Sequence, residues 1–190
     1  MKAFNEQIET LIDSSRQSLE QMAALTVTSI DTRLILKTSD TLPYAHIITY
    51  TDEEKNIGGE FVLGFGSVHD ALKLASGIGE KLGIGRFNKI SDDTTDLLNE
   101  FLNVVVGRTI STWDSMGMNV KFDTPVFKEN YSPPDSKQSK GYIVSMDVSP
   151  DPVDAEKKPS SEPIILRVNF MEKTENKLEN RRIMIAEDSR

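Results

Sequence analysis

The sequence predicts an α+β domain in which helices pack on a mostly antiparallel sheet. Amphipathic helical stretches and runs rich in β-branched residues follow one another in the order α-β-β-β-α-α-β-β-β. Strands grouped in this way, and not alternating with helices, are typical of an antiparallel sheet covered by helices. A hydrophobic fraction of 37% and a charged fraction of 27% over 190 residues suit one globular domain with a core.

The first half contains a helix, three strands and a second helix. Apolar residues recur at helical spacing over residues 4–24, while glutamate and glutamine fill the other face. Runs of β-branched residues predict the three strands, at residues 26–37, 45–51 and 58–65. Turns are expected between them, at Thr41-Leu42-Pro43 and at residues 52–56. Ser67 can cap the second helix, which continues to about Leu82 past the helix-weakening Gly77 and Gly79.

The second half begins with a long helix over residues 96–114. Ser91-Asp92-Asp93 just upstream supplies N-cap candidates and acidic first-turn residues. A strand is predicted at 119–127, and strands at 141–148 and 163–171 pair as a final hairpin. The segments 130–140 and 149–162 are rich in proline, serine and charge, which predicts loops.

The long helix has a polar stripe that contains the strongest functional signal. At about 100° per residue, Leu98, Phe101 and Leu102 point to one side of this helix. The stripe lies on the opposite side and comprises Asp96, Glu100, Asn103, Gly107 and Asp114. Gly107 costs about 1 kcal/mol against alanine in a helix, and would let the backbone of a partner come close.

Three of these residues, with Pro125, form the pattern D-x3-E-x2-N-x21-P. This pattern resembles the signature of the CheC/CheX family of chemotaxis phosphatases, and its single copy resembles the CheX branch. The resemblance implies two similar αβ3 halves, a homodimer, and hydrolysis of the aspartyl phosphate of a CheY-type response regulator. In the first helix, the candidate equivalent region between Glu9 and Glu20 contains no E-x2-N, so we expect one active site per chain.

The resemblance assigns a role to each motif residue. Glu100 would pair with a lysine of the regulator, and Asp96 would extend this contact. Asn103 would orient the attacking water, because an amide can hold a water molecule in line without changing its own charge. The partner would hold Mg²⁺, so we expect no metal and no cofactor on this chain.

Three other interpretations remain open. The same surface can serve a non-catalytic adaptor that binds a receiver and is related in fold to flagellar switch proteins. The stripe can also be an ordinary solvated helix face without a function. A bare E-x2-N is not specific, because it recurs at Glu53 and Asn56 in a turn-like stretch. A sensor that binds a small molecule between the halves is a third, weaker reading.

Composition limits the classes of partner and the compartment. The net charge of −8 argues against nucleic acid or an anionic membrane as partner. The absence of cysteine excludes disulfides and thiolate chemistry. No apolar run approaches the ~20 residues that span a bilayer, and no secretory signal is recognisable, so we expect a cytoplasmic protein. His46 and His69 have no metal-pair spacing, and His46 reads as an ordinary core or surface residue.

The predicted CheX-like domain covers residues 1–172, followed by a polar linker at 173–182. Residues 183–190 resemble the first strand of a receiver domain, in which Glu187 and Asp188 would begin a Mg²⁺ site. In this reading the target receiver is fused to the chain; otherwise it is met in trans. The alternative is a tail with a chance acidic pair.

Overall fold

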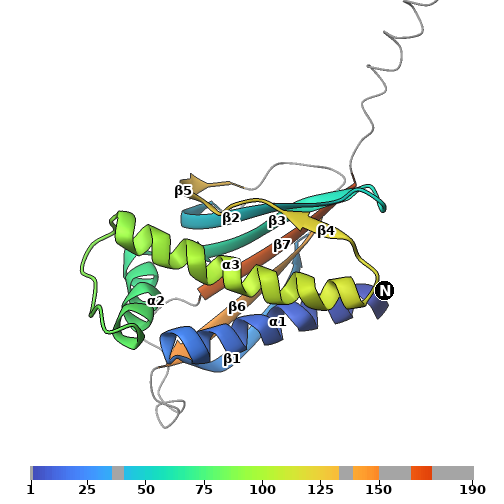
Figure 1. Ribbon diagram of the computed structural model, residues 1–190. Helices are drawn as coiled ribbons and strands as arrows, with labels where there is room; N and C mark the ends of the chain where they lie inside the picture. Colours follow the sequence, from blue (N-terminus) through green and yellow to red (C-terminus); the bar gives the residue numbers. More distant parts are fainter. Residues whose placement is uncertain (1, 36–40, 133–138, 150–163, 173–190) are drawn as a thin grey trace, which may run out of the picture.

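The computed structural model describes residues 2–35, 41–132, 139–149 and 164–172. In these ranges three helices lie on one face of a seven-stranded sheet (Figure 1), which confirms the α+β prediction. The elements, in chain order, are α1 (Lys2–Ala23), β1 (Thr26–Ile35), β2 (Leu42–Asp52), β3 (Ile57–Phe65), α2 (Val68–Lys81), α3 (Asp92–Ser115), β4 (Val120–Phe122), β5 (Val126–Tyr131), β6 (Ser139–Ser149) and β7 (Ile164–Glu172). The predicted linker at 173–182, the strand at 183–190 and nearly all of the loop at 149–162 lie outside the described residues.

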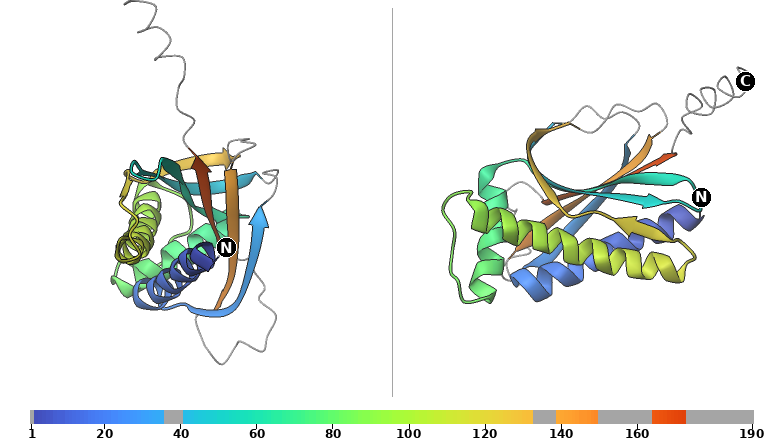
Figure 2. Two further views of the ribbon diagram at one scale, coloured as in Figure 1. Left: turned by 90° about the vertical axis from the view of Figure 1, so that its right-hand side faces the viewer. Right: turned by 45° about the horizontal axis from the view of Figure 1, so that its top comes forward.

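The sheet is built from two equivalent sets of strands. Its order is β1-β6-β7-β3-β2-β4, with β5 also paired to β2, and every described pairing is antiparallel. If β1 exchanges with β4 and β5, β2 with β6, and β3 with β7, the order reads the same from either edge. The helices α1 and α3, one from each half, pack side by side on the sheet (Figure 2). This arrangement agrees with a duplicated αβ unit.

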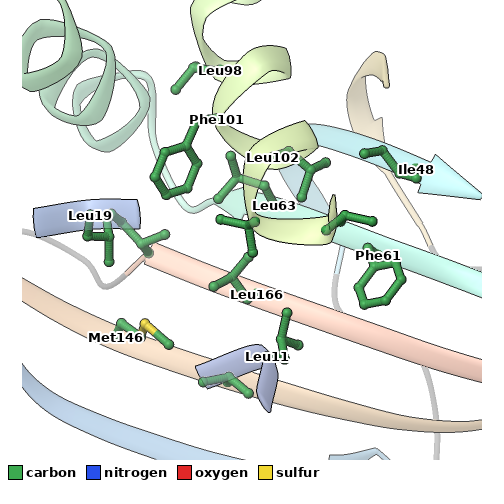
Figure 3. Close-up of a cluster of buried hydrophobic side chains, with 14 of the residues drawn as sticks. Leu11, Leu19, Ile48, Phe61, Leu63, Leu98, Phe101, Leu102, Met146 and Leu166 are labelled. Carbon is green, nitrogen blue, oxygen red and sulfur yellow. The ribbon is translucent and has the colours of Figure 1, made fainter. Parts of the chain in front are cut away.

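The core lies between the helices and the sheet. From α3, Leu98, Phe101 and Leu102 are almost wholly buried, and they meet side chains of β2, β3, β6, β7 and α1 (Figure 3). Burying each such side chain stabilises the fold by about 1.5–3 kcal/mol. Trp113 of α3 is fully buried as well. A smaller cluster fills the opposite face of the sheet and comprises Leu42, Ala45, Ile47, Val62 and Tyr131.

Most predicted boundaries lie within a few residues of the observed ones. The beginning of α3 follows its cap signal, since the Ser91 N–H donates to Thr94 Oγ1 at 2.7 Å and Asp92 opens the helix. The final hairpin is confirmed by the antiparallel pairing of β6 with β7. Gly77 lies inside α2, where a Cβ would be 2.7 Å from the Ala23 carbonyl oxygen. A side chain there would therefore push α2 away from α1.

Three local predictions are wrong. Leu42 and Pro43 belong to β2 and not to a turn; proline is tolerated there because it stands at the strand's start. The predicted strand at 119–127 is two strands, β4 and β5, separated by residues 123–125. The predicted loop at 130–140 is strand at both ends, because β5 continues to Tyr131 and β6 begins at Ser139.

Candidate functional site

The polar stripe of α3 faces away from the core. Asp96 and Glu100 are exposed, while Asn103 and Gly107 are half-buried. Residues three or four apart on a helix are neighbours on its surface, so these four positions form one continuous row. The structure therefore brings all the predicted site residues together, and their roles stay predictions.

Pro125 shapes the sheet edge beneath this helix. Both β4 and β5 pair with β2, but Tyr50 pairs with Phe122 whereas Ile47 pairs with Val126. Three residues of the edge strand thus oppose two residues of β2, which is the geometry of a bulge. Proline has no N–H to donate to the ladder and is accommodated at such a point. After the bulge the edge strand continues as β5.

His46 of β2 and Asn99 of α3, which sequence reasoning did not assign to the site, join the helix to the sheet. His46 of β2 is 1% exposed, and its Nδ1 lies 2.8 Å from Oδ1 of Asn99. Phe127 of β5 pairs with His46 across the strands, and the two ring centroids are 5.1 Å apart. The only available signal was the place of Asn99 at the border between the polar and apolar sides of the helix. The prediction that His46 is a core or surface residue is confirmed, since its side chain is buried; its contact with the motif helix was not predicted.

Burial lowers the pKa of His46, and the hydrogen bond to Asn99 partly offsets this effect. An unfolded chain has an ordinary histidine pKa of about 6.5, so below that pH it binds more protons at this position than the folded chain. We therefore expect wild type to lose unfolding free energy relative to the His46→Phe variant as the pH falls from about 7.5 to 5. Urea unfolding across this range, with His69→Phe as control, measures the difference. Parallel curves for wild type and His46→Phe would contradict the expectation.

A groove beside Gly107 runs between α3 and α1, and residues of both helices line it. Its volume is about 640 Å³, and its lining includes Asp13, Ser14 and Gln17 of α1 and Arg108 of α3. A Cβ added at Gly107 would meet nothing within 4 Å. Packing inside this chain therefore does not explain the glycine, and the helix backbone is open to a partner here.

The equivalent row on α1 lacks the asparagine. Thr26 at the beginning of β1 pairs with the end of β6, just as Val120 at the beginning of β4 pairs with the end of β2. Each glutamate of α1 is followed three residues later by a residue other than asparagine: Glu6 by Glu9, Glu9 by Ile12 and Glu20 by Ala23. One site per chain stays a prediction.

The described residues show neither a metal-binding cluster nor a membrane-spanning helix. In the ranges that the structure describes, no group of three or more histidine, aspartate or glutamate side chains is arranged to hold a metal ion. No helix among those residues is both long and apolar enough to span a bilayer.

Comparisons with known proteins relate the fold to chemotaxis proteins. No model of a known protein family matches the sequence, and no curated protein matches it. Among solved structures, the chemotaxis protein CheX of Vibrio vulnificus has a TM-score of 0.66 at 16% identity, over 87% of this chain and 99% of that chain. A CheC-like superfamily protein of Shewanella sp. PV-4 has the same TM-score and identity, over 86% and 96%. CheX in the Borrelia burgdorferi CheX–CheY–BeF3–Mg²⁺ complex has a TM-score of 0.63 at 18% identity, over 87% and 97%. The chain therefore has the fold of CheC-like and CheX proteins.

Proposed function

We propose that this chain is a phosphatase that hydrolyses the aspartyl phosphate of a CheY-type receiver domain. The observation that carries the proposal is the row of Glu100 and Asn103, one helical turn apart on the open side of α3, in a chain with the CheX fold. The solved CheX–CheY complex shows that a protein of this fold binds a receiver. The expected partner is a phosphorylated CheY-type regulator, met in trans or as a fused receiver.

Asn103 is assigned the chemistry. Phosphoryl transfer passes through a loose, in-line transition state, so an enzyme contributes mainly positioning and electrostatics. The Asn103 amide can accept a hydrogen bond from the attacking water at its oxygen and donate one from its nitrogen. Its half-buried position limits the side-chain motion that would blur this geometry. The result is a water held in line with the scissile bond.

Glu100 and Asp96 are assigned to docking. Both are exposed carboxylates, and Asp92 and Asp93 add negative charge one turn earlier. A carboxylate that meets a lysine beside the phosphorylated aspartate makes a charge-assisted hydrogen bond, which sets register as well as affinity. Mg²⁺ would be held by the receiver, and this chain would supply only the water-positioning amide and the docking acids.

Gly107→Ala should change stability and receiver binding in opposite directions. Because the added methyl has open space and alanine favours a helix, we expect the free energy of unfolding to rise by about 0.5–1 kcal/mol. The same methyl would clash with a closely packed partner at a cost of about 1–3 kcal/mol, so receiver affinity should fall about 5- to 150-fold. Urea unfolding and binding titration measure the two effects, with Ser111→Ala one turn later as control. Unchanged affinity would remove Gly107 from the interface.

The proposal is tested by the half-life of the phosphoryl group on a purified CheY-type receiver, with and without this chain. A phosphatase shortens the half-life. Binding without any shortening would favour the adaptor reading.

A further inference from the structure

A buried imidazole touches the motif helix directly behind the proposed active residues. His46 is enclosed on β2, and its Nδ1 is 2.8 Å from Asn99 Oδ1. An amide oxygen only accepts, so in this geometry Nδ1 carries the proton and donates it. Burial favours the neutral ring by lowering the pKa of His46. The hydrogen bond is therefore between two neutral groups of defined orientation.

Asn99 lies on α3 next to the two proposed active residues. It precedes Glu100 directly and lies one turn before Asn103, so the three side chains share a single stretch of helix. Its amide oxygen is held by β2, while the neighbouring stripe residues face outward. This hydrogen bond links the polar border of the helix to the sheet, whereas its apolar face packs on the core by non-directional contacts.

The imidazole itself is held from two sides. Phe127 of β5 lies 5.1 Å away between centroids, and Phe65 of β3 makes an edge contact at 6.4 Å. Phe127 follows the Pro125 bulge, and β5 is fastened further along, where the Tyr131 hydroxyl donates to Glu60 of β3. The orientation of His46 is thus set by three neighbouring strands.

We infer that His46 and Asn99 are positioning residues that fix the rotation of α3 about its axis. They would thereby set the direction in which the side chains of Asn103 and Glu100 project. The inference rests on the proposed phosphatase function. Side-chain tips stand about 5–6 Å from a helix axis, so a rotation of about 10° moves them by about 1 Å. A misplacement of that size can slow a reaction about 10²-fold.

The competing explanation is a structural hydrogen bond that does not affect the orientation of Asn103 and Glu100. Such a bond contributes to stability alone, and its loss would leave the turnover of folded molecules unchanged. The two explanations differ in turnover measured on fully folded protein, and in whether the two residues act as one unit.

The experiment compares His46→Phe, Asn99→Leu and their double variant with wild type, under conditions where urea unfolding shows each to be folded. We expect each single variant to lower turnover about 10- to 100-fold, with receiver affinity within about threefold of wild type. Because the residues act through one bond, the double variant should be no slower than the worse single variant. Asn99→Asp keeps the acceptor oxygen and should recover much of the loss. Asn88→Ala, an exposed loop asparagine, is the control and should behave as wild type.

Three results would overturn the inference: turnover within about twofold of wild type, losses that multiply in the double variant, or affinity that falls in step with turnover. Amide hydrogen exchange gives a reading independent of activity. His46→Phe should speed exchange over residues 96–103 of α3 and leave α2 unchanged. If wild type shows no phosphatase activity, the proposed function fails; unchanged exchange would then overturn the positioning role as well.

Discussion

Replacement of Asn103 by alanine should abolish most of the acceleration of receiver dephosphorylation, with a loss of about 10²-fold or more in turnover. The reason is that water would still reach the phosphoryl group but would no longer be held in line with it. Asn103 lies on the outer side of α3 and contributes little to the core, so the variant should fold normally. Phosphoryl decay on the receiver, followed at saturating chain, measures the effect.

The controls for Asn103→Ala separate chemistry from binding. Receiver affinity should stay within about threefold of wild type, because docking is assigned to the carboxylates. Asn88→Ala makes the same chemical change on an exposed loop and should leave turnover intact. If Asn103→Ala dephosphorylated the receiver at the wild-type rate, the amide would have no catalytic role.

Replacement of Glu100 by alanine should weaken receiver binding by about 10- to 100-fold. A hydrogen bond between charged groups contributes about 1.5–3 kcal/mol, and each 1.4 kcal/mol changes affinity tenfold. Since the pairing is electrostatic, the affinity of the variant should also depend less on salt than that of wild type. Titration at low and high ionic strength measures both effects.

Two exposed carboxylates serve as controls for Glu100→Ala. Asp114→Ala removes a charge from the same stripe at the far end of α3, and Glu20→Ala removes one from α1. Neither should match the effect of Glu100→Ala. Equal losses for all three would mean that net charge, and not a specific pairing, drives association.

Local sequence patterns predict most of the helices and strands. The helix α3 was predictable because its apolar spacing, its Ser91 cap and its acidic first turn agree. The same periodicity placed Glu100 and Asn103 on the outer side before any tertiary information was available. The strands β3 and β7 were found from composition alone, but no local signal indicates that they lie side by side at the centre of the sheet.

The features that sequence reasoning missed depend on tertiary contacts. The bulge at Pro125 is evident only from the pairing of β4 and β5 with β2, because the run at 119–127 itself looks continuous. The hydrogen bond between His46 and Asn99 joins residues 53 positions apart, on different elements. Its existence depends on strand order and helix placement, which pattern reasoning does not reach.

The most direct test of the phosphatase proposal is the rate of phosphoryl loss from a CheY-type receiver at increasing concentrations of this chain, kept below that of the receiver. A phosphatase predicts a rate that rises in proportion to the chain, with each molecule clearing many receivers. A decay rate that stays at the receiver's own value, while titration shows that the two proteins bind, would contradict it. In that case the stripe on α3 would be a docking surface without catalysis.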